Sequence, residues 1–146
     1  MIYPEFSPED RKDEKAEMKV FDQLKKVADV YDIFYSKSFV TDGAGKKPEY
    51  EIDFIVAIPE QAIVCIEVKG GLIRYDGMKD QWTQNSRVMS KRPDRQATSA
   101  SHALANSFSE SIANMPVGWA LCFPDCQMEQ GKGLTTSLAQ EQLLDD

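Results

Sequence analysis

Histidine and cysteine are scarce in this chain of 146 residues, which excludes several common kinds of site. The one histidine, His102, has no partner motif, so we expect it to pack or to face solvent. The three cysteines, Cys65, Cys122 and Cys126, cannot complete a disulfide framework, and no second Cys or His pair completes a zinc site. We therefore expect reduced thiols of the kind found in cytosolic proteins.

Long apolar runs and a signal-peptide pattern are also lacking. No run of about 18 apolar residues occurs, so no segment is expected to span a membrane. Glu5, Glu9 and Asp10 stand near the N-terminus, where a signal peptide would have a basic and then an apolar stretch. With 42% hydrophobic and 28% charged residues, the sequence predicts a globular domain in the cytoplasm.

Positive charge is in short supply overall, but it is concentrated. The net charge of −7 argues against a nucleic-acid partner. Residues 69–95, however, contain seven basic and three acidic residues, whereas residues 96–146 contain six acidic residues and one lysine. Because charges more than roughly 10 Å apart are largely screened, a nucleic acid would respond to the local patch. The segment is either a solvated basic loop or a nucleic-acid-binding surface, in which Lys91, Arg92 and Arg95 would contact the phosphate backbone.

The stretch from residue 51 to residue 71 predicts two consecutive core strands. Residues 51–58 and 62–71 are mostly apolar and rich in β-branched side chains, and residues 59–61 form the turn between them. Strands of this composition are typical of the middle of an α/β sheet, where both faces are buried.

Three ionisable residues, Asp53, Glu67 and Lys69, interrupt these strands. Because side chains alternate along a strand, Glu67 and Lys69 share one face, while Ile66 and Val68 project from the other. A buried charge is costly unless it is paired or bound to a metal. We therefore expect a functional site at the ends of these two strands.

The remaining segments predict a three-layer α/β fold with a central mixed sheet flanked by helices. Ser7 and Pro8 begin a helix whose apolar stripe carries Glu17 toward the sheet. The expected elements are a helix over 8–30, a first strand over 33–40, the two core strands, a hairpin at the sheet edge over 72–82, a helix over 93–115 and a strand over 117–123. We expect residues 1–126 to form the domain and residues 127–146 to be a polar tail or linker.

Asp53 followed by Glu67-Val68-Lys69 forms the Asp…Glu-x-Lys constellation of metal-dependent nucleases. The two carboxylates would supply hard oxygen ligands to Mg²⁺, which activates a water and neutralises charge on a phosphate. Lys69 would orient the attacking water, and Glu17 would contact the metal or a metal-bound water. Alternatively, Glu67 and Lys69 form an internal ion pair, Asp53 only ends a strand, and Glu17 marks the solvated end of the helical stripe.

Short motifs extend this pattern over about residues 14–125. They are Ala16-Glu17 with the helix running on to Leu24, Glu51 to Phe54, Ile66 to Gly70, Gly77 to Trp82, Pro93 to Ala97, and Phe123-Pro124. In their order and spacing the chain resembles the nuclease-related domain (NERD) family, a branch of the restriction-endonuclease-like, PD-(D/E)xK superfamily. Two positions depart from that pattern: Ala16 stands where a glycine is expected, and Gly71 replaces a larger, often aromatic residue.

The resemblance implies a divalent metal, Mg²⁺ or Mn²⁺, at Asp53 and Glu67, and cleavage of nucleic-acid phosphodiester bonds. It makes Glu17 the helical carboxylate of the site. The resemblance alone assigns Gln96 as the polar residue that the second helix directs toward the metal or phosphate. Family members often carry this domain beside a helicase, kinase or zinc-binding module. The chain would then be the N-terminal part of a larger DNA-processing protein, or equally a short stand-alone protein.

The leading hypothesis is therefore a Mg²⁺-dependent deoxyribonuclease, with RNA left open as a substrate. A second hypothesis is a nucleic-acid-binding or scaffolding module of the same fold that does not cut. The third is a purely structural α/β domain that contains the Glu67–Lys69 ion pair.

Overall fold

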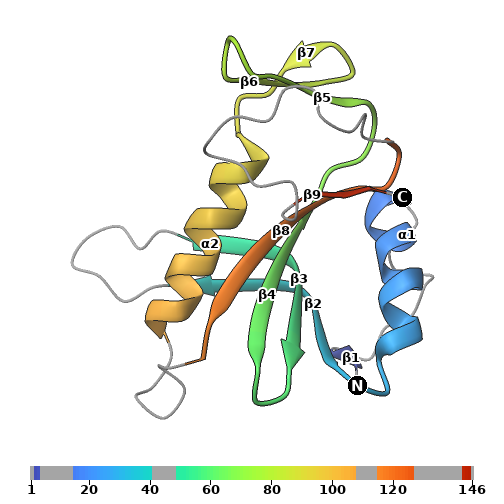
Figure 1. Cartoon of the computed structure of the whole chain (residues 1–146), viewed down its shortest axis with the longest axis vertical. Coiled ribbons are helices and arrows are strands. Elements are labelled where there is room, and N and C mark those ends of the chain that lie inside the picture. The colour runs from blue at the N-terminus through green and yellow to red at the C-terminus, as the bar shows by residue number, and fades with distance from the viewer. Residues whose placement is uncertain (1, 4–14, 41–48, 108–114, 127–142, 146) are drawn as a thin grey trace.

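The apolar, β-branched stretches form one large sheet between two helices. A computed structural model describes residues 2–3, 15–40, 49–107, 115–126 and 143–145 (Figure 1). Among these residues, six strands form the main sheet in the order β1-β2-β3-β4-β8-β9. Their bounds are β1 (Ile2–Tyr3), β2 (Asp32–Val40), β3 (Glu49–Ile58), β4 (Ala62–Val68), β8 (Val117–Phe123) and β9 (Leu143–Asp145).

The two predicted core strands, β3 and β4, lie in the middle of this sheet. β3 is antiparallel to β2 and to β4, while β4 is parallel to β8, so the sheet is mixed as predicted. Residues 59–61 form the turn between β3 and β4, and the predicted first strand is continuous over Asp32–Val40. The short outer strands β1 and β9 were not predicted.

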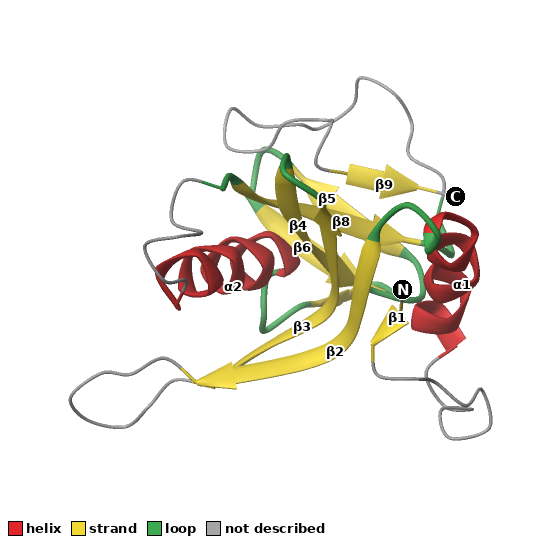
Figure 2. Cartoon of the chain, turned by 90° about the horizontal axis from the view of Figure 1, so that it is seen from below, coloured by secondary structure: helices red, strands yellow, loops and turns green. Residues whose placement is uncertain are grey.

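Helices cover both faces of the sheet, which confirms the three-layer arrangement (Figure 2). On one face, α1 (Lys15–Leu24) packs Phe21 in a core cluster with Ile66 and Val68. On the other face, α2 (Pro93–Ser107) packs Ala100 in a cluster with Cys65. The alternation predicted along β4 is therefore correct, and it separates two apolar layers.

The predicted bounds of the two helices need correction. The expected start of the first helix at Pro8 lies outside the described residues. Its end comes before Val30, because α1 ends at Leu24 and continues only as the 3₁₀ turn η2 (Lys25–Val27). The chain must reverse there to enter β2, and β-branched Val27 and Val30 favour a helix weakly. The second helix was predicted to run to Met115, but Met115 is not helical. α2 is described as far as Ser107, and residues 108–114 lie outside the described residues.

The predicted hairpin does not join the edge of the main sheet. β5 (Ile73–Asp76), β6 (Gln81–Gln84) and β7 (Arg87–Val88) form a separate three-stranded antiparallel sheet. The reason is that β3 and β8 already occupy both sides of β4, so the chain leaving β4 finds no free edge. Figure 1 shows this small sheet beyond the end of β4, above the start of α2.

The small sheet is held by its own apolar face. Ile73 and Trp82 are buried against Ala97 of α2 and Phe123 of β8. The segment that follows β8 was predicted to be a polar tail from residue 127. Most of it lies outside the described residues, but β9 pairs in parallel with β8.

Candidate active site

Asp53 and Glu67 come together where β3 and β4 separate. The ladder between these strands ends with Phe54 opposite Ile66, and the same register places Asp53 beside Glu67 on one face of the sheet. Oδ2 of Asp53 accepts a 2.7 Å hydrogen bond from the backbone N–H of Val68. Beyond the last ladder pair, this side-chain hydrogen bond therefore links the two strands. The sheet thus holds two carboxylates side by side at its end, as the sequence predicts.

Both carboxyl groups are harder to ionise than usual. Burial, and next the charge of Glu67, raises the pKa of Asp53 from 3.8 to about 7. Burial also raises the pKa of Glu67, which is only 7% exposed, although Lys69 opposes that shift. Two desolvated carboxylates with too little positive charge around them are a place where a cation gains strong electrostatic stabilisation.

Lys69 lies on the same face as Glu67, as predicted from the alternation. Its Nζ is 3.1 Å from Oε1 of Glu67, and its side chain is 23% exposed. The ammonium group therefore sits between a buried carboxylate and solvent. The backbone holds it there, because the N–H of Lys69 donates to the carbonyl of Cys122 on β8 over 3.0 Å.

Glu17 reaches the site region from α1. The hydroxyl of Tyr35 on β2 donates to Oε2 of Glu17 over 2.9 Å, so this carboxylate does turn toward the sheet. Its negative charge contributes to the raised pKa of Glu67. Whether Glu17 also touches a metal or a metal-bound water stays a prediction.

Gln96 lies in the first turn of α2 with an unsatisfied oxygen. Its Oε1 is buried, and no described residue donates to it. The same side chain lines a hollow of about 630 Å³ together with Glu51, Lys91 and Arg95. A buried acceptor without a donor, on a side chain that lines a hollow, is a candidate to accept a hydrogen bond from a water or a ligand.

Ala16 and Gly71, the two positions that depart from the expected pattern, both lie at the turn after Lys69. A Cβ at Gly70 would lie 2.8 Å from Cβ of Ala16, so the methyl group of Ala16 fills the space against a glycine. Gly71 has φ +79°, and a Cβ there would lie 2.7 Å from Oδ1 of Asn85. A larger residue at 71 would require a different partner at position 85.

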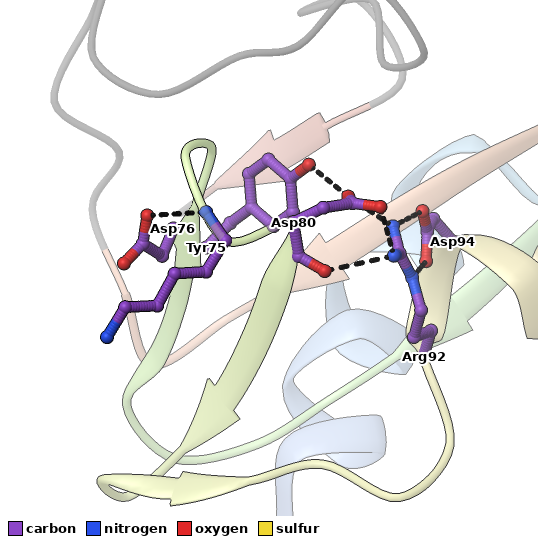
Figure 3. A network of polar contacts seen from close by, with 6 residues as sticks. Tyr75, Asp76, Asp80, Arg92 and Asp94 are labelled. Carbon is purple, nitrogen blue, oxygen red and sulfur yellow. Dashed lines mark hydrogen bonds and ion pairs between the residues drawn. The ribbon is translucent and has the colours of Figure 1, made fainter.

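Arg92 is fully occupied by contacts within the protein (Figure 3). Its five N–H groups make five hydrogen bonds: three to Asp80, through Oδ1, Oδ2 and the backbone carbonyl, and two to the carboxylate of Asp94. Hydrogen bonds from Arg92, and next from Tyr75, lower the pKa of Asp80 to about 2. Arg92 thereby ties the turn between β5 and β6 to the start of α2, and a contact with phosphate stays a prediction.

The donor set fits a small divalent cation of the Mg²⁺ type. Within the described ranges, no three Asp, Glu, His or Cys side chains converge as a metal cluster. Mg²⁺ is commonly bound by one or two carboxylates and completes its shell with waters and substrate phosphate. The pair Asp53 and Glu67 meets that requirement, since two carboxylates are enough when water and phosphate supply the remaining oxygens.

Sequence reasoning missed two residues that shape the site. The charge of Glu51 raises the pKa of both Asp53 and Glu67, and its position two residues before Asp53 on the same strand was a usable signal. Tyr35 holds Glu17, but no local pattern predicts which residue of another strand meets a helical carboxylate.

Neither helix in the described part of the chain has the length and apolar character needed to cross a membrane. Comparisons with curated proteins and with solved structures found no match. Residues 12–124 match the nuclease-related domain (NERD) family, which is well over half of the sequence. Because this match covers well over half of the sequence, the chain belongs to the nuclease-related domain family.

Proposed function

We propose that this domain is a Mg²⁺- or Mn²⁺-dependent nuclease that hydrolyses DNA phosphodiester bonds. The observation that carries the proposal is the pair of buried neighbouring carboxylates, Asp53 and Glu67, with the ammonium of Lys69 3.1 Å from Glu67. Membership of the family supports a nucleic-acid substrate, and the local excess of basic residues supports its phosphate backbone as the group recognised.

Asp53 and Glu67 would hold the cation, whose chemistry when bound is to activate water and to neutralise charge on the phosphate. The ammonium of Lys69 orients the attacking water and balances charge that builds on the phosphate oxygens. Glu67 holds that ammonium in place through their ion pair. Glu17 and Gln96 support the site from the two helices, one on each face of the sheet.

The substrate backbone would lie along the basic side of the site. Lys91 and Arg95 line the same hollow as Gln96, so they are the backbone contacts that we favour. Arg92 borders this hollow too, but its hydrogen bonds to Asp80 and Asp94 favour a structural role.

A cleavage assay tests the proposal directly. Circular and linear DNA are incubated with the protein in Mg²⁺, Mn²⁺ or EDTA, beside the Asp53→Ala and Lys69→Ala variants. We expect cleavage that requires the metal and is lost in both variants, while Lys69→Ala still binds Mg²⁺. Cleavage in EDTA, or unchanged cleavage by Lys69→Ala, would contradict the roles assigned here; cutting of the circle would identify an endonuclease.

One observation favours the non-cleaving module as a second candidate. Two rather than three metal-binding side chains meet within the described residues, and Glu67 already has a cationic partner in Lys69. This candidate predicts salt-sensitive DNA binding with no product in any divalent metal. The same assay, read beside a binding measurement, separates the two.

A further inference from the structure

A second hollow, of about 620 Å³, adjoins the site on the side of the small sheet. It includes Lys69 and is bounded by the β6–β7 hairpin. Its polar lining residues are Lys69, Gln84, Asn85, Arg87, Ser90 and Lys91. Three of these are cationic and none is acidic, in a chain whose net charge is −7. Three cationic side chains in one hollow, among them the predicted catalytic Lys69, create a positive potential that attracts an anion.

Arg87 is the cation of this hollow that the sequence did not single out. Gln84 pairs with Ile73 on one side and with Arg87 on the other, and directly opposed residues in an antiparallel sheet share a face. The amide of Gln84 donates to the carbonyl of Gly70 over 2.8 Å. Arg87 therefore lies on the face of the hairpin that is turned toward the segment after Lys69.

The hairpin is held in a fixed position relative to Lys69. Asn85 and Ser86 have φ of 49° and 66°, the conformation of a two-residue hairpin turn that matches the strand twist. The N–H of Asn85 donates to the carbonyl of Leu72, and the N–H of Leu72 donates to Oδ1 of Asn85, each over 2.9 Å. A guanidinium at position 87 is thus presented by a rigid element that is connected to the site by hydrogen bonds.

The Arg87 side chain is exposed, and no carboxylate among the described residues forms an ion pair with it. The two hollows share Ser90 and Lys91 in their linings, so they are neighbours, and Lys69 lines the one under the hairpin. Two neighbouring hollows that each contain cationic side chains suit a polyanionic strand better than a single small anion.

We propose that the hollow under the β6–β7 hairpin is a phosphate-binding subsite for the nucleic-acid strand next to the cleaved phosphodiester, with Arg87 as its main phosphate ligand. This rests on the proposed function for its substrate class. The hollow beside Gln96 then holds the part of the strand on the other side of the cleaved bond.

The small sheet offers a matched control in Arg74. Arg74 is also exposed, but it pairs with Thr83, the residue next to Gln84 on β6. Because neighbouring residues on a strand point to opposite faces, Arg74 projects from the other face of the hairpin. It does not line the hollow. Replacing either arginine removes one positive charge from the same small sheet, so a difference between the variants reports position and not net charge.

The test measures binding without cleavage. Affinities of the wild type, Arg87→Ala and Arg74→Ala for a labelled single-stranded oligonucleotide and for its duplex are measured in EDTA at several salt concentrations. We expect Arg87→Ala to weaken binding roughly 10-fold and to reduce the slope of log affinity against log salt by about one, because one phosphate contact is lost. Arg74→Ala should match the wild type, and thermal unfolding should show all three equally folded.

Each outcome decides the proposal. Equal affinities and salt slopes for Arg87→Ala and Arg74→Ala would overturn the subsite, as would a wild type that binds no nucleic acid. A selective loss in Arg87→Ala would support it even if no metal gave cleavage, in which case the nuclease proposal alone would fail. Where cleavage occurs, Arg87→Ala should raise KM, because a contact that binds the substrate is lost.

Discussion

At the scale of single residues, the unusual feature is a carboxylate pair that the protein makes unfavourable to ionise. Asp53 and Glu67 are neighbours across two strands, both are desolvated, and the ammonium of Lys69 pairs with Glu67. Desolvation of the two carboxylates costs stability, which the hydrogen bond from Val68 and the ion pair with Lys69 oppose. The proposed bound cation would offset this cost further.

Replacing Asp53 with Asn tests this in metal-free protein. The raised pKa of Asp53 means that the folded state binds its proton more tightly than the unfolded state does. Stability therefore falls as the pH rises between about 4 and about 7, and the loss persists above that range. Asp53→Asn keeps an acceptor for the N–H of Val68 but cannot ionise, so its stability should vary less with pH over that window.

The measurement is urea unfolding in EDTA across this pH range. Asp29→Asn, at an exposed position on the turn after η2, serves as the control and should follow the wild type. At about pH 8 we expect Asp53→Asn to be at least as stable as the wild type. A parallel pH dependence of Asp53→Asn and wild type would mean that Asp53 titrates normally.

At the scale of elements, the small sheet is connected to the rest by a few polar ties. Arg92 joins the β5–β6 turn to α2, while Asn85 and Gln84 join the β6–β7 hairpin to the segment after Lys69. These ties hold the cationic hollow and the carboxylates in one arrangement, although they belong to different sheets.

Arg92→Ala should loosen this connection. The carboxylate of Asp94, whose side chain is 12% exposed, would lose the two hydrogen bonds that the guanidinium of Arg92 donates to it. We expect a loss of roughly 1–3 kcal/mol in the free energy of unfolding, the usual cost of an unpaired and largely buried polar group. Arg95→Ala, at an exposed position three residues later, should cost far less.

Chemical denaturation of both variants, beside their DNA affinities, separates the two roles of Arg92. The structural role predicts lower stability first and lower affinity only as its consequence. Weaker DNA binding with unchanged stability would instead favour the backbone contact that the sequence predicts.

At the scale of the whole molecule, the functional groups gather at one end. The end of β4 and the first turn of α2 lie toward the same end of the molecule, with the small sheet beyond them (Figure 1). Gly70, just after β4, packs closely against Ala16 of α1. Negative charge dominates the chain as a whole, so the positive hollow is a local exception beside an acidic pair.

Added Mg²⁺ should therefore stabilise the whole domain. A ligand that binds only the folded state at about 100 times its Kd adds about 2.7 kcal/mol of stability. Thermal unfolding with and without Mg²⁺ should show a higher Tm for the wild type and for Asp29→Asn, and no change for Asp53→Asn. If the domain were purely structural, Mg²⁺ would leave every Tm unchanged, and Glu67→Ala would cost about 3–5 kcal/mol by leaving Lys69 unpaired.

Much of the fold and the centre of the site could be predicted from short-range patterns. Alternation along residues 62–69 placed Glu67 and Lys69 on one face, because the period of a strand is two. Apolar, β-branched composition placed β3 and β4 in the middle of the sheet. Gln96 had no such local signal and entered only through the family resemblance.

The sequence by itself therefore determined the order of the elements, the two faces of the central strands and the carboxylate–lysine pattern, since each depends on residues close together in the chain. Tertiary structure decided that the hairpin forms its own sheet, that Arg92 is engaged by Asp80 and Asp94, and that Arg87 lines one hollow with Lys69. These outcomes depend on which strand edges are already paired and on which side chains meet across long stretches of chain. Hydrogen-bond partners of that kind are selected by packing, and no local periodicity encodes them.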